Sequence, residues 1–229
     1  MPDFTYRDIA KMIDHSLLQQ TLIDAELDAG CRLARAYDVA SVCIKPYYVQ
    51  RAAEHLAGSQ VAVGTTIGFP HGGHVTSIKV AESVQAMKDG AVELDMVVNI
   101  GKVLSKDWRY VTDDIRAVVE AGHSGKALVK VIFENCFLTD DLKQRLCEIC
   151  GTVRADFVKT STGYGATGAT TEDLTLMRKY APPHVQVKAA GGVRTFERLL
   201  EVRALGVTRV GATASQPILD ECKARLGIK

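Results

Sequence analysis

The stretch VQVKAAGGVRTFERLLEVRA, residues 185–204, contains a strand, a loop and a helix. It opens with alternating apolar and polar residues, passes through two glycines, and continues with apolar residues at helical spacing. Alternation with a period of two is typical of a strand, whereas apolar residues three and four positions apart indicate a helix. The stretch therefore predicts a strand over Val185–Ala190 and a helix over Thr195–Ala204, with Thr195 as a favourable N-cap.

The same order of strand and helix recurs along the chain. Between the β-rich runs lie amphipathic segments such as Asp107–Ala121, which has apolar residues at helical spacing. Strands that alternate with helices favour a parallel sheet, and eight is the number of strands that closes a (β/α)8 barrel. The predicted strands are Met12–Leu17, Val39–Ile44, Val61–Ile67, Val92–Val98, Leu128–Phe133, Asp156–Ser161, Val185–Ala190 and Arg209–Gly211.

We therefore predict an α/β protein with a single (β/α)8 TIM-barrel domain that spans residues 1–229. A short N-terminal helix over Phe4–Lys11 is expected to cap the floor of the barrel. A doubly wound open sheet is the alternative. It usually has fewer strands, and no G-x-G-x-x-G motif follows the first predicted strand.

Three predicted strands contain a lysine, although barrel strands are covered on both faces and normally consist of apolar residues. Lys130, Lys159 and Lys188 are equally spaced, since 159 − 130 = 29 and 188 − 159 = 29. The equal spacing predicts that they lie at the same level of neighbouring strands. Successive side chains of a strand point to opposite faces, and the valines beside Lys188 fit the outer face. We therefore expect the lysines to point into the barrel.

A neighbouring strand contributes acids. It places Glu93 and Asp95 on one face, opposite two apolar residues, so Asp95 is expected to meet the lysines inside the barrel mouth. Burial and a nearby second cation both lower the pKa of a lysine, and a neutral amine is what attack on a carbonyl requires. The pattern predicts a Schiff-base lysine beside a proton-carrying carboxylate, but does not select one of the three lysines. The alternative is that these lysines lie at strand ends and reach solvent.

Glycine and hydroxyl residues follow the last three predicted strands. The strands with Lys159 and Lys188 run directly into such loops, and the eighth strand ends in the similar run GATAS, residues 211–215. Glycine lets backbone N–H groups approach an anion, and barrels often bind phosphate at the loops after their last two strands. We expect a phosphate site on this rim, with ordinary turn formation as the alternative.

The composition argues against several classes of partner. The net charge is +1 and aromatic residues make up 6%, so we expect neither the basic surface nor the stacking platform of a nucleic-acid-binding protein. No apolar run is long enough for a membrane span, and the N-terminus lacks the features of a signal peptide. The six cysteines are too sparse for a disulfide framework, and we expect a cytoplasmic protein.

Two short motifs contain potential metal ligands. His71 and His74 form H-x-x-H in a glycine-rich loop, and Cys147 and Cys150 form a lone C-x-x-C in a helical run. Neither motif has the further ligands of a zinc site close by in sequence. We expect packing for the cysteines, a structural hydrogen bond for His15, and no bound metal or cofactor.

Taken together, several stretches resemble the deoxyribose-phosphate aldolases, a family of class I aldolases. The most specific are FVKTSTG (157–163) and VKAAGGVR (187–194), and the others are IDHSLL, VCI, IGFPHG, ELDMVVN and KVI. They occur in the expected order between residues 13 and about 213. The resemblance implies a metal-independent barrel enzyme, in dimeric form, that cleaves 2-deoxy-D-ribose 5-phosphate to glyceraldehyde 3-phosphate and acetaldehyde.

The resemblance also implies roles for residues of this chain. Lys159 matches the Schiff-base lysine, and Lys188 matches the second lysine, which lowers the pKa of the first. Asp95 matches the acid of a proton relay that works through water, and Lys130 looks like a supporting residue that pairs with this acid. The pocket-lining positions correspond to Asp14 and Cys43, and the phosphate-binding positions to Thr162, Gly163, Gly191, Gly192, Gly211 and Thr213.

Three features depart from the family pattern. Tyr164 stands where some members have a lysine near the phosphate, so a cation is missing there. Thr213 replaces a serine that is common in the last loop, and it keeps a hydroxyl. The chain ends at Lys229 without the C-terminal tyrosine of some members, which bears on the rate of proton exchange rather than on the reaction type. A Schiff-base aldolase for another small sugar phosphate and a non-catalytic phosphate-binding barrel stay open as alternatives.

Overall fold

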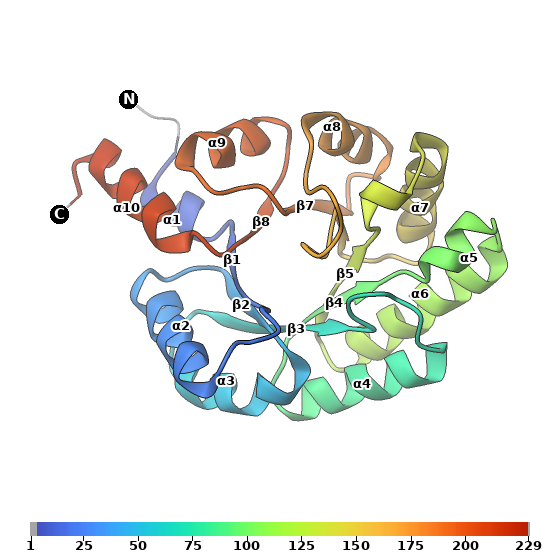
Figure 1. Cartoon of the computed structure of the whole chain (residues 1–229), viewed down its shortest axis with the longest axis horizontal. Helices are drawn as coiled ribbons and strands as arrows, with labels where there is room; N and C mark the ends of the chain where they lie inside the picture. The colour runs from blue at the N-terminus through green and yellow to red at the C-terminus, as the bar shows by residue number, and fades with distance from the viewer. Residues whose placement is uncertain (1–3, 229) are drawn as a thin grey trace.

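Eight parallel strands close into a barrel in the order β1 to β8, and β8 pairs with β1 (Figure 1). The computed structural model describes residues 4–228. Closure confirms the predicted (β/α)8 barrel, so the alternative of an open doubly wound sheet is wrong. The strands are β1 (Ile13–Leu17), β2 (Ser41–Ile44), β3 (Ala62–Ile67), β4 (Glu93–Val97), β5 (Leu128–Ile132), β6 (Phe157–Lys159), β7 (Gln186–Ala190) and β8 (Arg209–Ala212).

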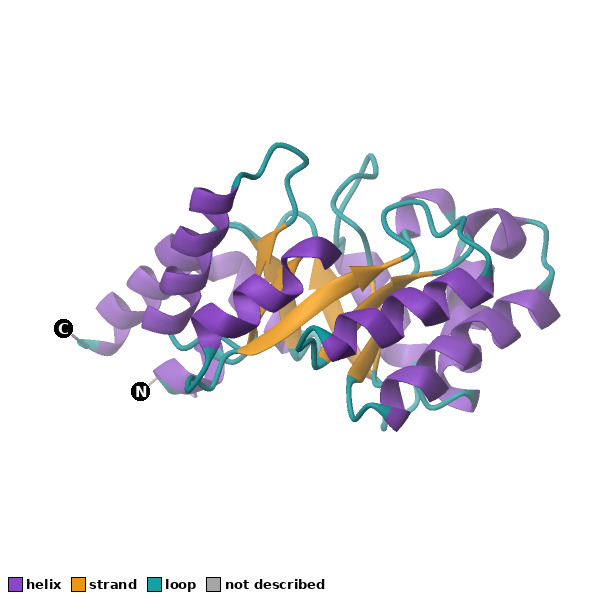
Figure 2. Cartoon of the chain, turned by 90° about the horizontal axis from the view of Figure 1, so that it is seen from below, coloured by secondary structure: helices purple, strands orange, loops and turns teal. Residues whose placement is uncertain are grey.

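Helices surround the barrel, and at least one follows each strand (Figures 1 and 2). As predicted, Thr195 caps α9: its side chain accepts a hydrogen bond from the backbone N–H of Arg198. The longer helices are α2 (Asp24–Ala36), α3 (Val49–Leu56), α4 (Thr76–Lys88), α6 (Trp108–Ser124), α7 (Asp140–Thr152), α8 (Thr171–Tyr180), α9 (Phe196–Ala204) and α10 (Ser215–Leu226). The short ones are α1 (Tyr6–Ala10), α5 (Ile100–Leu104) and the 3₁₀ turns η1 (Pro46–Tyr48) and η2 (Asn135–Phe137).

The N-terminal helix α1 is shorter than predicted and lies to one side of the barrel floor. It packs against α10, where Figure 1 shows it, and Ile9 is fully buried. The ring of Phe4 lies edge-on to the ring of Phe196 on α9, with 5.7 Å between the centroids. These apolar contacts draw the segment toward the neighbouring helices rather than across the centre of the floor.

Side chains alternate between the two faces of each strand, as the sequence predicted. On β4, Leu94 and Met96 are fully buried in the apolar core, whereas Asp95 between them contacts the lysines of other strands. Lys130, Lys159 and Lys188 are all buried, each with at most 3% of its surface exposed. The alternative in which these lysines reach solvent is therefore wrong, and the inside of the barrel carries charged groups in place of the usual apolar layers.

The register of the strands corrects one prediction. Lys159 pairs with Lys188, as the equal spacing suggested, but Lys130 pairs with Phe157 and lies two residues closer to the floor than Lys159. The number of residues in a strand–helix unit does not fix the register, because strands must stagger when a sheet closes into a barrel. Lys130 instead lies at the level of Asp95 on β4.

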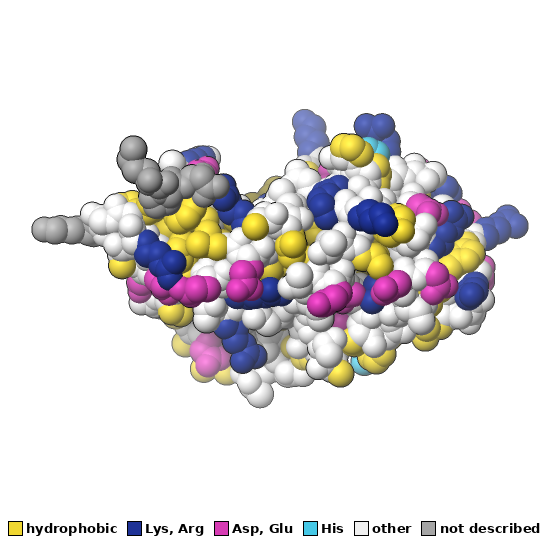
Figure 3. Space-filling view, turned by 90° about the horizontal axis from the view of Figure 1, so that it is seen from above, with side chains coloured by type: hydrophobic (Ala, Val, Ile, Leu, Met, Phe, Trp, Pro, Cys, Tyr) yellow, Lys and Arg dark blue, Asp and Glu magenta, His cyan; other side chains and the backbone are white. Residues whose placement is uncertain are grey.

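The outer surface carries basic and acidic side chains close together. Figure 3 shows them interspersed over one face, in keeping with the net charge of +1. That face therefore has no extended basic patch of the kind that binds nucleic acid. Within residues 4–228, no helix is both long enough and apolar enough to cross a membrane.

Candidate active site

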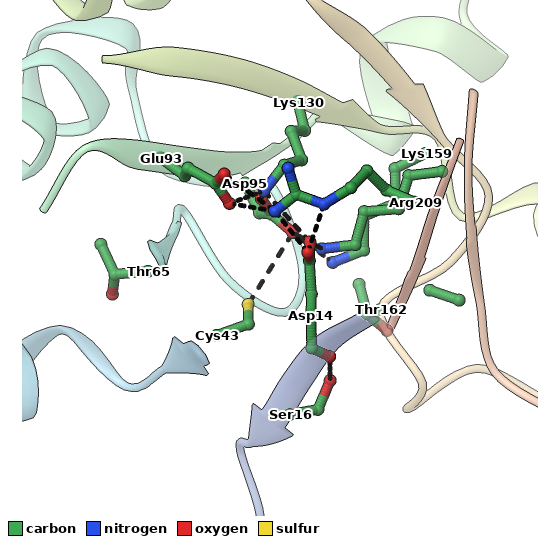
Figure 4. A network of polar contacts seen from close by, with 12 residues as sticks. Asp14, Ser16, Cys43, Thr65, Glu93, Asp95, Lys130, Lys159, Thr162 and Arg209 are labelled. Atoms are coloured by element: carbon green, nitrogen blue, oxygen red, sulfur yellow. Dashed lines mark hydrogen bonds and ion pairs between the residues drawn. The ribbon is translucent and has the colours of Figure 1, made fainter. Parts of the chain in front are cut away.

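Seven charged side chains from six strands meet inside the barrel (Figure 4). We call them the barrel cluster. Its members are Asp14 of β1, Glu93 and Asp95 of β4, Lys130 of β5, Lys159 of β6, Lys188 of β7 and Arg209 of β8. Such a concentration of buried, mutually paired charges is typical of a functional site.

Asp95 lies at the centre of the barrel cluster. Its Oδ2 accepts hydrogen bonds from Lys159 Nζ and Lys188 Nζ, both at 2.7 Å, and its Oδ1 accepts one from Lys130 Nζ at 3.0 Å. Burial alone would raise the pKa of this carboxyl, but the three lysines hold the pKa well below its ordinary value. Asp95 is therefore a carboxylate that links all three lysines.

Asp14 forms a second centre nearer the floor. Its Oδ2 lies 2.5 Å from Lys188 Nζ and 3.2 Å from Lys130 Nζ, and its Oδ1 accepts from Arg209 Nε at 2.6 Å. Burial raises the pKa of Asp14, yet these cations hold it below the ordinary value of an aspartate. Glu93 completes the group, with its Oε2 2.6 Å from Lys130 Nζ.

Lys159 differs from the other two lysines in the acids that it faces. Within residues 4–228 its ion pair is with Asp95 alone, through the oxygen that Lys188 also contacts. Burial lowers the pKa of Lys159, Asp95 opposes this effect in part, and the positive charge of Lys188 lowers the pKa further. The result is an amine whose pKa lies below its ordinary value.

Lys188 and Lys130 behave in the opposite way. Burial by itself would lower the pKa of Lys188, but Asp14 and Asp95 raise it above the ordinary value. Lys130 has Glu93 as a third acidic neighbour, and the acids around it raise its pKa well above the ordinary value. Both remain ammonium groups at neutral pH, so Lys188 places a positive charge next to Lys159.

Cys43 lies on β2 with its thiol directed at Asp95 Oδ2, at 3.8 Å. It is buried, and burial followed by the charge of Asp95 raises the pKa of the thiol. Cys43 is therefore a neutral side chain in the wall of the site rather than a thiolate nucleophile.

A cavity of about 510 Å³ opens above Lys159. Its lining includes Lys159 together with all six residues predicted to hold phosphate: Thr162, Gly163, Gly191, Gly192, Gly211 and Thr213. The loops after β6, β7 and β8 thus surround one space, at the carboxyl ends of the strands, where barrel enzymes place their active sites.

Two glycines of this rim could not be replaced without strain. Gly191 has φ +82°, and a Cβ there would lie 2.8 Å from the Cα of Gly168 on the neighbouring loop. Gly192 has φ +90° with open space around it. The first lets two loops pack closely, and the second gives an exposed backbone segment that an anion can approach.

Thr162 has a second role that the sequence did not suggest. Its backbone N–H donates to Glu134 Oε1 at 3.2 Å, and its hydroxyl donates to Glu134 Oε2. Glu134 is buried and has φ +57°, just after β5. The hydrogen-bond donors of Thr162 are therefore directed at a carboxylate, which orders the loop.

Tyr164 lines both the cavity above Lys159 and a second, mostly apolar cavity of about 660 Å³. Its hydroxyl donates to the Leu18 carbonyl at 2.5 Å, and its ring lies edge-on to Phe69 with 5.4 Å between the centroids. The tyrosine thus bridges the loop after β6 to the segment after β1, at the position where a lysine was noted as missing.

Comparison with known proteins identifies the family. The model of the DeoC/LacD family aldolases matches residues 9–213. The chain belongs to this family. A deoxyribose-phosphate aldolase of Rhodopirellula baltica is 58% identical over 100% of this chain and 95% of its own length, and one from Listeria monocytogenes serotype 4a is 49% identical over 93% and 95%.

Solved structures agree with this family assignment. A putative deoxyribose-phosphate aldolase from Coccidioides immitis superposes with a TM-score of 0.92 at 38% identity, covering 97% of this chain and 88% of that one. The deoxyribose phosphate aldolase of Aeropyrum pernix, described as tetrameric, gives a TM-score of 0.89 at 26% identity, with coverage of 96% and 93%. The DeoC/LacD aldolase fold therefore extends over nearly the whole chain.

Other candidate residues from the sequence lie apart from the barrel cluster. Cys147 and Cys150 are buried free thiols of α7, and burial raises the pKa of Cys147 to about 12. His15 Nδ1 lies 2.8 Å from Ser215 Oγ, and burial lowers its pKa to about 4, so it is a neutral structural histidine. His71 and His74 are exposed, and between residues 4 and 228 no group of His, Cys, Asp or Glu is arranged to hold a metal ion.

Sequence reasoning missed two charged residues of this region. Arg209 stands at the start of the short strand β8, beside Val210, and the argument that singled out lysines on apolar strands applies to it equally. Glu134 had no such signal, because it follows β5 in a left-handed conformation that no local pattern predicted.

Proposed function

We propose that this chain reversibly cleaves 2-deoxy-D-ribose 5-phosphate to D-glyceraldehyde 3-phosphate and acetaldehyde through a Schiff base on Lys159. The observation that carries the proposal is the Lys159 amine, which is buried, shares the carboxylate of Asp95 with Lys188, and lies beneath a cavity lined by glycine loops. Membership of the DeoC/LacD aldolases and the names of the relatives support the same reaction and a small sugar phosphate as substrate.

Lys159 begins the reaction as the nucleophile. Its neutral amine attacks C1 of the open-chain aldehyde, and loss of water from the carbinolamine gives an iminium ion. The ammonium of Lys188, near Lys159 through their shared contact with Asp95, is placed to donate a proton to the departing hydroxyl. The iminium then acts as the electron sink for bond cleavage.

Asp95 serves the proton transfers that follow. The C3 hydroxyl gives up its proton toward Asp95 through water, the C2–C3 bond breaks, and its electrons form an enamine on Lys159. Glyceraldehyde 3-phosphate leaves. Protonation of the enamine at C2 and addition of one water then release acetaldehyde and restore the amine, so the water lost in the first step is returned. Lys130, bonded to Asp95 Oδ1, holds the carboxylate in place.

The phosphate is proposed to bind at the glycine rim of the cavity. Gly163, Gly191, Gly192 and Gly211 allow close approach of the backbone, and Thr213 adds a hydroxyl. We assign Thr162 to loop positioning through Glu134 rather than to direct phosphate binding. Asp14 and Cys43 complete the wall of the site, and Asp14 also fixes Lys188.

A turnover assay tests the proposed function. Incubation with 2-deoxyribose 5-phosphate should give acetaldehyde and glyceraldehyde 3-phosphate in equal amounts, whereas ribose 5-phosphate, which carries a 2-hydroxyl, should be cleaved far more slowly. Cleavage of another sugar phosphate in preference would favour an aldolase of different specificity. Binding of sugar phosphates without cleavage of any would favour a non-catalytic barrel.

Removal of metal ions should leave the turnover unchanged. Within the described chain every carboxylate of the barrel cluster is already paired with lysine or arginine, and the iminium supplies the electron sink that a metal would otherwise provide. The check is a comparison of kcat before and after treatment with EDTA and gel filtration. A loss of activity that added zinc or magnesium restores would contradict the proposed mechanism.

Replacement of Tyr164 by lysine should shift selectivity toward phosphorylated substrate. A cation at the edge of the cavity adds a charge-assisted hydrogen bond to phosphate, so kcat/KM for 2-deoxyribose 5-phosphate relative to free deoxyribose should rise by about fivefold. Tyr164→Phe is the matched control, since it keeps the ring against Phe69 without adding a charge. An equal change of both substrates in Tyr164→Lys would place the phosphate elsewhere.

The homodimer and the cytoplasmic location stay predictions. The free state of all six cysteines supports a reducing compartment. The mass in solution, measured by light scattering, distinguishes a dimer from the tetramer described for the Aeropyrum pernix relative.

A further inference from the structure

Arg209 is the one arginine of the barrel cluster within residues 4–228. It stands opposite Lys188 in the register of β7 and β8, and 11% of its side chain is exposed. Its guanidinium joins two acids from different strands: Nε contacts Asp14 Oδ1 at 2.6 Å, and Nη2 contacts both oxygens of Glu93 at 2.8 Å. It has no contact with the cavity above Lys159.

The barrel cluster contains one more basic group than acids. It has three carboxyl groups and four basic groups, namely the three lysines and Arg209. With all groups ionised, the interior would carry an excess positive charge, which is costly in a buried environment. The cluster is electrically neutral when one basic group gives up its proton.

The contacts determine which group gives up its proton. Arg209 is bonded to both Asp14 and Glu93, and a guanidinium does not deprotonate in proteins. Lys130 and Lys188 each face at least two carboxylates. Lys159 faces only Asp95 among the described residues, so its proton is held least strongly.

We propose that Arg209 is a positioning residue that sets the charge balance of the barrel cluster, and that its fixed charge makes Lys159 the neutral nucleophile. Arg209 pairs with Asp14 and Glu93 and balances one of the three negative charges. The three lysines therefore share the two negative charges that are left. Without this guanidinium, three lysines would match three acids, and the neutral cluster would be the one with Lys159 protonated. The inference deepens the proposed function and rests on it.

The charge balance depends on the charged and titratable groups that face Lys159 and Arg209. Asp95, Lys188 and the Cys43 thiol face Lys159, and the thiol stays neutral because burial raises its pKa. Arg209 faces Asp14 and Glu93, and also Lys130, whose pKa it lowers slightly against the effect of the acids. Its uncharged neighbours are the Ser41 hydroxyl, which accepts from Nη2 at 3.0 Å, and the Phe157 ring.

The test is the pH dependence of Lys159 in charge variants. For each protein, the rate of borohydride-trapped adduct formation with acetaldehyde, and kcat/KM for 2-deoxyribose 5-phosphate, are measured from pH 5 to pH 10. Each rate should rise with pH as Lys159 loses its proton, and we call this rising part of the pH profile the acid limb. In Arg209→Met, the midpoint of the acid limb should move up by about one pH unit, which makes trapping about tenfold slower below the midpoint. Arg209→Lys keeps the charge and should return the midpoint toward that of the parent.

Glu93→Gln supplies the opposite change. It removes an acid and leaves a larger excess of positive charge, so the acid limb should move to lower pH. The double variant Arg209→Met with Glu93→Gln should return the midpoint close to the parent value. A merely structural role of Arg209 would lower the melting temperature in both single variants without shifting the limb in opposite directions.

Each outcome decides the inference. If the acid limb of Arg209→Met does not move, or if Glu93→Gln moves it upward, the inference is overturned, while an adduct on Lys159 in the parent still supports the proposed function. If Arg209→Met does not fold, the direction of the shift in Glu93→Gln decides alone. If the parent forms no adduct on Lys159 at any pH, the proposed function is overturned and this inference with it.

Discussion

Replacement of Lys159 by leucine should abolish the reduced acetaldehyde adduct and lower turnover by about 10⁵-fold, the range found when a covalent nucleophile is removed. The parent protein, treated with acetaldehyde and borohydride, should carry an N-ethyl group on Lys159 that peptide mass spectrometry locates. The variant should fold, because Asp95 keeps Lys130 and Lys188 as partners and no carboxylate is left unpaired. Loss of a buried amine in exchange for an apolar side chain should not lower the melting temperature.

Lys88→Leu is the matched control for this experiment. Lys88 is exposed at the end of α4, so it tests whether removal of any lysine changes the labelling. It should leave both turnover and the Lys159 adduct unchanged. An adduct spread over surface lysines in the parent, or one that persists elsewhere in Lys159→Leu, would be incompatible with a Schiff base on Lys159.

The direction of the three lysines could be predicted from the sequence, but their ranking could not. Direction follows from the period of two in a strand, which is a local property. The ranking depends on which carboxylates each ammonium faces, and Asp14 and Asp95 come from strands far away in the chain. Equal spacing even suggested one level for all three, whereas barrel stagger places Lys130 lower than Lys159.

The loops proposed to bind phosphate also have features that the sequence could predict and features that it could not. Their glycines could be predicted because they follow strands that are easy to find, and parallel strands bring the ends of neighbouring loops together. The partner of Thr162 could not be predicted, since Glu134 reaches it from the preceding strand–helix unit through a left-handed residue. Arg209, by contrast, was missed although it could have been predicted, since it is a charged residue on a strand that otherwise contains only apolar or small residues.

Replacement of Lys188 by leucine should lower turnover by about 10³-fold at neutral pH while the protein stays folded. Two causes add. The proton donor beside the carbinolamine is lost, which typically costs 10²- to 10⁴-fold. Lys159 also loses an adjacent cation and becomes the one lysine bonded to Asp95 Oδ2 among the described residues, so its pKa rises and less of it is neutral.

The pH profile separates these two causes. The part of the loss that comes from protonation of Lys159 should disappear as the pH rises above the new pKa, whereas the part that comes from the missing proton donor should remain. Lys143→Leu, which removes a buried lysine from its ion pair with Asp173 between α7 and α8, is the control: it should lower stability without moving the acid limb. Near-normal turnover of Lys188→Leu would reduce Lys188 to a packing residue. Full recovery at high pH would limit it to the tuning of Lys159, and a loss that persists there would support its second role in proton transfer.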